Sequence, residues 1–164
     1  MLIICDGGYH PDLRGRRTAV YGFVVCIGAA LTSIHQECGV VCRGPAAGSQ
    51  MAELGAIVAA LRWLVACPGA PAAVRIRSDS LEAVQAVAGG RPPRLRRGSV
   101  TLLREAARLL TRLRRLGCEV EVYHALRCYT KPADKLCWKA YAQVPPGGRH
   151  SVGSFLRPGL EAAD

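Results

Sequence analysis

The stretch LIICDGGYH, Leu2 to His10, opens the chain with four apolar residues, one carboxylate and two glycines. A short apolar run of this kind is typical of a strand buried inside a sheet. Because Asp-Gly is a common turn signal, we expect the strand to end at Cys5 and Asp6 to begin a turn. A carboxylate in this position could also be presented by the strand at an edge of the sheet. The rest of the sequence decides between these two interpretations.

Downstream of this stretch, strand-like and helix-like patterns follow one another. β-Branched and aromatic residues mark two further extended segments joined by short turns, which favours consecutive antiparallel pairing. Segments with apolar residues at helical spacing then alternate with short extended segments. The expected strands are Leu2–Cys5, Ala19–Ile27, Ser33–Cys42, Val74–Ser78 and Glu119–Ala125. The expected helices are Ser49–Cys67, Leu81–Ala88, Val100–Leu116 and Pro132–Ala142.

This order of elements, β-β-β-α-β-α-α-β-α, predicts an α/β domain. Three antiparallel strands, followed by parallel strands that are reached through helical crossovers, form a mixed sheet covered by helices. Ser49 is expected to cap the first long helix, and Pro68-Gly69 to end it. A basic loop with two adjacent prolines, Gly89–Ser99, separates the short helix from the second long helix.

The end of the chain does not follow this pattern. Val144–Asp164 is rich in proline and glycine, and we expect it to be a tail attached to a domain of residues 1–143. The segment SFLRPGL within this tail is compatible with three roles. It could dock on the domain, recruit a partner or stay mobile, and the sequence does not choose among them.

The composition limits the class of protein. The 164 residues, half of them apolar, suffice for one domain with a buried core. The longest apolar run, around Ala56–Ala66, is broken by Arg62 and is shorter than a membrane span, and the first fifteen residues lack a signal-peptide pattern. We therefore expect a cytoplasmic monomer without a membrane partner. The eight cysteines include no Cys-x-x-Cys pair, which favours buried thiols over a disulfide framework.

The net charge indicates a polyanionic partner. Lysine and arginine number 22 against 12 acidic residues, giving a formal charge of +10. Arginine predominates, and its guanidinium suits bidentate contacts with phosphate. No basic amphipathic helix with an aromatic face stands out, so nucleic acid is favoured over a membrane surface. A solvated basic surface is the alternative explanation.

Four carboxylates stand out by their positions. Taken singly, three have structural explanations: Asp6 starts a turn, Asp79 caps a helix and Asp134 complements a helix dipole. Glu53 lies at the border of an apolar stripe, where a carboxylate needs a partner or a metal. If the strands of Asp6 and Asp79 are parallel neighbours, both residues emerge at one edge of the sheet. Glu53 and Asp134 lie in first turns that can reach this edge. Such a cluster requires cations, and Mg²⁺ prefers oxygen ligands.

The motifs Asp6-Gly-Gly, YGFVV, AELGAIVAAL, RIRSDS and YHALRCYTKPAD together resemble the type 1 ribonuclease H family, in particular its short, reverse-transcriptase-like branch. The resemblance covers residues 1–143 in unbroken order. It implies a ribonuclease H-like fold with a five-stranded mixed sheet, and hydrolysis of the RNA strand of RNA–DNA hybrids to 5′-phosphate products. It also implies two Mg²⁺ ions, with Mn²⁺ as a substitute. Asp6 would bridge both ions, Glu53 and Asp79 would complete one, and Asp134 the other.

The resemblance also implies which residues contact the substrate. The basic loop stands where longer family members carry a basic protrusion, so phosphate contacts are expected from Arg91, Arg94, Arg96 and Arg97. Contacts that recognise 2′-hydroxyl groups are expected near Gly7, Gly8, Ser49 and Gln50. Ser49 and Gln50 replace two asparagines that many members have. Two auxiliary residues are considered. His124 is expected to be structural rather than a proton shuttle, and Arg127 matches an arginine of the short branch.

Three functions therefore fit the sequence. The first is a ribonuclease H acting on RNA–DNA hybrids. The second is a nuclease of the same fold acting on double-stranded RNA or a DNA junction, and the third is a non-catalytic nucleic-acid-binding module. The four intact carboxylates argue against the third, because a binding module does not need clustered negative charge beside phosphate. The segment Tyr9-His10-Pro11 is where we expect this protein to differ most from its relatives.

Overall fold

The computed structural model is built around a five-stranded mixed sheet with the strand order β3-β2-β1-β4-β5. β1 pairs antiparallel with β2, and β2 with β3, whereas β4 and β5 extend the sheet in parallel from β1. The predicted mixed sheet is confirmed. The strands are β1 (Leu2–Pro11), β2 (Arg17–Ile27), β3 (Thr32–Arg43), β4 (Ala73–Ser78) and β5 (Glu119–His124). The structure describes residues 1–11, 16–69, 71–90, 97–144 and 155–156.

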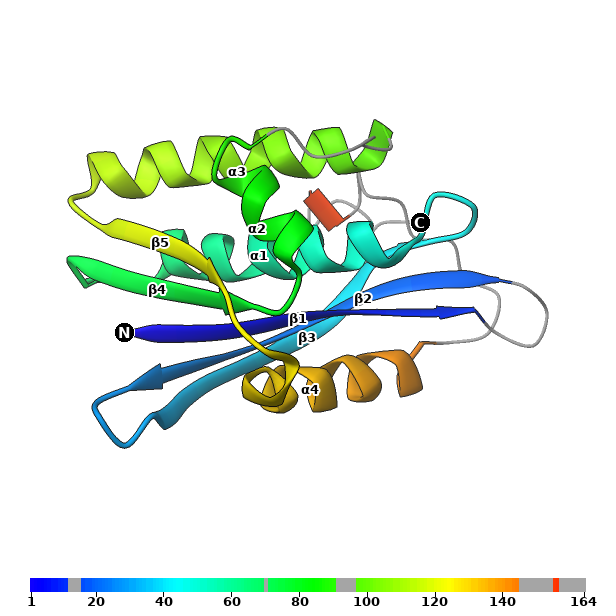
Figure 1. Cartoon of the computed structure of the whole chain (residues 1–164), viewed down its shortest axis with the longest axis horizontal. Helices are drawn as coiled ribbons and strands as arrows, with labels where there is room; N and C mark the ends of the chain where they lie inside the picture. Colours follow the sequence, from blue (N-terminus) through cyan, green and yellow to red (C-terminus); the bar gives the residue numbers. More distant parts are fainter. Residues whose placement is uncertain (12–15, 70, 91–96, 145–154, 157–164) are drawn as a thin grey trace.

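Helices cover both faces of this sheet (Figure 1). Three of them lie on one face and α4 lies on the other. A short 3-10 helix, η1 (Arg127–Tyr129), leads from β5 into α4. The helices are α1 (Ser49–Ala66), α2 (Leu81–Val87), α3 (Arg97–Arg115) and α4 (Lys131–Ala142). The sheet therefore has a helical layer on each side, and its central strand β1 is buried on both faces.

The first strand does not end at Asp6. β1 continues through Gly7 and Gly8 to Pro11, and every one of its residues pairs with a residue of β2. Asp6 lies opposite Gly22, and Gly7 lies opposite Tyr21. The predicted turn at Asp6-Gly7 is therefore wrong. A long antiparallel ladder overrides the local turn preference, because it supplies hydrogen-bond partners that the isolated dipeptide lacks.

The ends of the long helices differ in part from the prediction. Gly48, not Ser49, is the N-cap residue of α1, and no side chain caps it. The helix ends before Pro68, as expected, and α3 begins at Arg97, three residues earlier than expected. The sequence argument against a membrane span considered only the apolar run around Ala56–Ala66. The whole of α1 is long and apolar enough to cross a membrane, by length and composition alone, so that argument is wrong. Most of α1 is buried inside the domain, and the core helix of a soluble protein passes the same test.

The main core lies between the sheet and helices α1 and α3, and a smaller apolar layer lies beneath α4. Phe155, from the expected tail, is buried in the main core. Arg62 of α1 donates hydrogen bonds of 2.6 Å to the carbonyl oxygens of Phe155 and Leu156. Of the three roles left open for SFLRPGL, docking is the one these two residues adopt. All eight cysteines are free thiols, five of them buried, as expected.

Candidate active site

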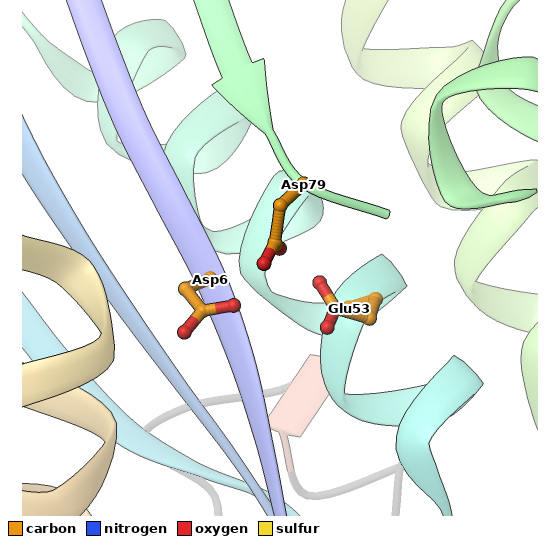
Figure 2. Close-up of side chains that lie close together, drawn as sticks. All are labelled: Asp6, Glu53 and Asp79. Atoms are coloured by element: carbon orange, nitrogen blue, oxygen red, sulfur yellow. The ribbon is translucent and has the colours of Figure 1, made fainter. Parts of the chain in front are cut away.

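Two carboxylates lie where the parallel strands part. The ladder between β1 and β4 ends at Ile4 and Arg77, each two residues before an aspartate. Asp6 and Asp79 are therefore at the same level of the sheet, at the carboxyl end of β4. Ser80, not Asp79, is the N-cap of α2, since its hydroxyl accepts a hydrogen bond from the Ala83 backbone N–H. The capping explanation for Asp79 is wrong, and its carboxylate is directed to the site (Figure 2).

Glu53 joins the two aspartates because α1 approaches β1 very closely. A Cβ atom at Gly7 would lie only 2.3 Å from the carbonyl carbon of Ala52 and 2.3 Å from the nitrogen of Glu53. Only glycine fits there, so the backbone of α1 rests directly on the strand. One oxygen each of Asp6, Glu53 and Asp79 lies within 4.8 Å of the others. Figure 2 shows the three side chains converging from β1, α1 and the end of β4.

We call Asp6, Glu53 and Asp79 together the carboxylate group. Their mutual repulsion is unfavourable when no cation is bound. Burial, together with the charges of the two aspartates, raises the pKa of Glu53 from 4.5 to about 9. Burial and the adjacent Asp79 likewise raise the pKa of Asp6 from 3.8 to about 7. A hydrogen bond from the Gly7 backbone N–H opposes both rises only in part.

The same group offers ligand atoms that nothing else uses. Among the described residues, neither Oε2 of Glu53 nor Oδ1 of Asp79 has a hydrogen-bond partner, although both atoms are buried. Buried polar atoms normally have partners, so these oxygens are unusual. Three converging carboxylates with unpaired oxygens fit a hard divalent cation, which prefers oxygen ligands.

Asp134 lies beside this group rather than within it. It occupies the first turn of α4, as predicted, and its charge raises the pKa of Asp6. Nη2 of Arg127 lies 3.4 Å from Oδ1 of Asp134, and the charge of Arg127 also lowers the pKa of Glu53. Arg127 therefore stands near both sides of the site. The Cys137 thiol donates a hydrogen bond of 3.2 Å to the Asp6 carbonyl oxygen, which ties α4 to β1.

The other predicted residues are placed in several ways. Ser49 and Gln50 lie in the first turn of α1, about one turn before Glu53. His124 is exposed at the end of β5. Arg97 is the first residue of α3, and the remaining members of the basic loop fall outside the described residues, namely Arg91, Arg94 and Arg96.

Sequence reasoning assigned Gly7 and Gly8 to a turn near the substrate and missed their packing role. A Cβ atom at Gly8 would lie 2.8 Å from a methyl group of Val20 and 3.0 Å from Cβ of Cys137. Glycine inside a strand pattern is a signal for close backbone approach, and it was present in the sequence. No comparable signal in the sequence predicted that the Cys137 thiol would donate a hydrogen bond to the Asp6 carbonyl oxygen.

Comparison with solved structures relates this architecture to a known fold. The ribonuclease H1 of the archaeon Halobacterium salinarum matches with a TM-score of 0.69 at 20% identity, over 87% of this chain and 98% of that one. The N-terminal ribonuclease H domain of a Mycobacterium tuberculosis protein matches with a TM-score of 0.68 at 21% identity, over 85% and 96%. LC11 ribonuclease H1, isolated from compost and solved with an RNA/DNA hybrid, matches with a TM-score of 0.64 at 20% identity, over 85% of this chain and 94% of that one.

The chain therefore has the ribonuclease H fold, as its motifs predicted. Neither a protein-family model nor a curated protein matches it. At about 20% identity the structural likeness establishes the fold alone. An activity has to be argued from the side chains that this chain places on that fold.

Proposed function

We propose that this protein is a divalent-cation-dependent endoribonuclease that hydrolyses the RNA strand of RNA–DNA hybrids and leaves 5′-phosphate ends. The observation that carries the proposal is the convergence of Asp6, Glu53 and Asp79, with two buried oxygens lacking partners. A module that only bound nucleic acid would gain nothing from this group, because its negative charge repels phosphate. Among the structures that match this fold, LC11 ribonuclease H1 and a foamy viral protease-reverse transcriptase were each solved with an RNA/DNA hybrid, and the foamy viral protein also with double-stranded DNA.

The proposed roles follow from the positions of the carboxylates. Asp6 groups with Glu53 and Asp79, and the charge of Asp134 also acts on it, so Asp6 would contact both of two Mg²⁺ or Mn²⁺ ions. When bound, such ions lower the pKa of an attacking water and stabilise the charge on the leaving oxygen. Arg127 would hold Asp134 in position through the contact of 3.4 Å.

Substrate contacts are assigned by position. The first turn of α1, with Ser49 and Gln50, is expected to face the ribose of the RNA strand near the carboxylates, where a 2′-hydroxyl can be recognised. The net charge of +10 favours association with a polyanion and makes the affinity sensitive to salt. Residues 1–143 would supply this activity.

The test is a cleavage assay with three end-labelled substrates: an RNA–DNA hybrid, duplex RNA and duplex DNA, each with Mg²⁺ or Mn²⁺. We expect cleavage of the RNA strand of the hybrid. We expect Asp79→Asn to reduce the cleavage rate by more than about 100-fold. Loss of a residue that only hydrogen-bonds a metal ligand typically costs about 10- to 100-fold, and loss of a ligand itself should cost more. Glu119→Gln is the matched control, since this exposed carboxylate lies at the opposite end of the sheet.

The three substrates separate the competing functions. Cleavage of duplex RNA or duplex DNA in preference to the hybrid would reassign the substrate while keeping the nuclease. Binding of all three substrates without cleavage, with either metal, would reduce the protein to a binding module. Equal activity of Asp79→Asn and Glu119→Gln would show that the carboxylate group is not the catalytic site.

A further inference from the structure

Three aromatic rings form a cluster on the surface beside α4. The imidazole of His10, near the end of β1, lies with its centroid 4.4 Å from the Trp138 ring and 4.4 Å from the Tyr141 ring. The Trp138 side chain is 56% exposed. An indole that is tilted at 51° against His10 and more than half exposed contributes little to the core. We call His10, Trp138 and Tyr141 the aromatic cluster.

The aromatic cluster continues directly from the candidate active site. Asp134, Trp138 and Tyr141 are spaced i, i+4 and i+7 on α4, so they share one side of the helix. Trp138 therefore lies about 6 Å along the helix from Asp134. On the neighbouring strand, β1 runs from Asp6 past the carboxylates to His10. β1 and α4 thus each carry a carboxylate of the candidate site and, further along, a ring of the aromatic cluster.

Positive charge flanks the aromatic cluster. Lys131, Lys135 and Lys139 are exposed on α4 at intervals of four residues, which places them on one stripe. At 100° per residue, this stripe lies next to the side that carries Trp138. Aromatic rings bordered by cationic side chains are the arrangement with which proteins hold single-stranded nucleic acid, the rings stacking on bases and the cations contacting phosphates.

We propose that the aromatic cluster binds an unpaired nucleobase of a single-stranded extension that adjoins the duplex held at the carboxylates, with Lys135 and Lys139 contacting its phosphates. This deepens the proposed function and rests on it for the position of the duplex. A base within a duplex is already stacked on its neighbours, so the exposed indole of Trp138 selects a base that is not stacked. The protein would therefore prefer hybrids with a single-stranded extension over blunt hybrids.

The test uses the fluorescence of tryptophan, because the chain contains only two. Trp63 lies on α1, where its ring is 5.1 Å from His35 and 6.4 Å from Phe23. Trp63→Phe therefore leaves Trp138 as the only tryptophan, and Trp138→Phe leaves only Trp63. Each full-length variant is titrated with a single-stranded oligonucleotide of about 12 nucleotides, as RNA and as DNA, in EDTA at low salt.

We expect quenching in Trp63→Phe and none in Trp138→Phe, with either or both oligonucleotides. We expect Trp138→Ala to weaken binding by about 5- to 150-fold, the usual range for one stacked base. A hybrid with an extension should quench Trp138 more than a blunt hybrid. Circular dichroism checks that the variants are folded, and His10→Ala supplies a second, independent perturbation of the aromatic cluster.

The outcomes distinguish this proposal from the proposed function. Quenching of Trp138 by a protein that cleaves no substrate would support the aromatic cluster and overturn the nuclease. Hybrid cleavage by a protein whose Trp138 is not quenched would overturn the aromatic cluster and keep the nuclease. Unchanged affinity of both Trp138→Ala and His10→Ala would also overturn it, since the rings would then contact no base.

Discussion

Glu53→Gln should make the metal-free protein more stable while removing its proposed activity. In the folded protein the pKa of Glu53 is raised from its ordinary value of 4.5 to about 9, by burial first and then by Asp6 and Asp79. The unfolded chain therefore releases this proton above pH 4.5, whereas the folded protein keeps it until about pH 9. Because the unfolded state binds fewer protons over this interval, folding loses stability as the pH rises through it.

The magnitude follows from the interval. Each pH unit between 4.5 and 7 contributes about 1.36 kcal/mol, so the ionisable group costs on the order of 3 kcal/mol at pH 7. Glutamine cannot ionise and avoids this cost. For a domain of this size, the melting temperature of Glu53→Gln should rise by roughly 6–12 °C at pH 7. Near pH 4 the variant and the unaltered protein should be equally stable.

The assay is urea unfolding in EDTA between pH 4 and pH 9, with Glu119→Gln as the exposed control. The difference between Glu53→Gln and the unaltered protein should grow with pH, while the control shows none. Added Mg²⁺ should stabilise the unaltered protein, by about 2.7 kcal/mol at a concentration 100 times the dissociation constant, and the variant much less. Parallel pH profiles for all three proteins would refute the reasoning, because Glu53 would then not be crowded in the way described.

Three further predictions concern packing and charge. Gly7→Ala places a Cβ 2.3 Å from the backbone of Ala52, so urea unfolding should show a loss of at least about 1–3 kcal/mol, and unchanged stability would contradict the contact. Arg62→Met removes two hydrogen bonds to the docked segment at Phe155 and the ion pair with Glu105; we expect a loss of about 1.5–3 kcal/mol and faster proteolysis of that segment, followed by mass spectrometry. Lys139→Gln should lower by about one the slope of log affinity for an extended hybrid against log salt concentration, whereas an identical slope would show no phosphate contact.

The sequence was sufficient for the order of elements and for bringing together three of the four predicted carboxylates, Asp6, Glu53 and Asp79. Both depend on local periodicity and on the rule that parallel strands end at one edge, and neither requires knowledge of side-chain packing. The prediction failed at Asp6-Gly7, where a local turn preference competed with ten consecutive pairs to β2. At Asp79 only the capping explanation considered for the residue taken singly is wrong, because Ser80 next to it is the cap.

Contacts between residues far apart in the sequence were beyond such reasoning. Arg62 is held by carbonyl groups more than ninety residues away, and a backbone carbonyl leaves no trace in the sequence. His10 meets Trp138 only because β1 runs longer than its apolar run indicates. The unusual composition of Tyr9-His10-Pro11 was visible, but its partners on α4 were not.

Two glycines explain how acidic residues from both helical layers reach Asp6. Gly7 follows Asp6 in the chain and Gly22 faces it across the ladder. The missing side chain of Gly7 seats α1 on the strand at Ala52, the residue before Glu53. At Gly22 a Cβ would lie 2.6 Å from the carbonyl oxygen of Ala133, the residue before Asp134.

Each glycine therefore fixes a helix at the residue next to a carboxylate, one from each face of the sheet. Repulsion among the carboxylates cannot move these helices away without opening well-packed contacts against β1 and β2. The backbone therefore stays in place, and the carboxyl groups of Asp6 and Glu53 hold their protons to higher pH instead. The raised pKa values of Asp6 and Glu53 are thus a consequence of the packing at the glycines. A divalent cation would relieve the same repulsion without any movement of the backbone, which is the property expected of a preformed metal site.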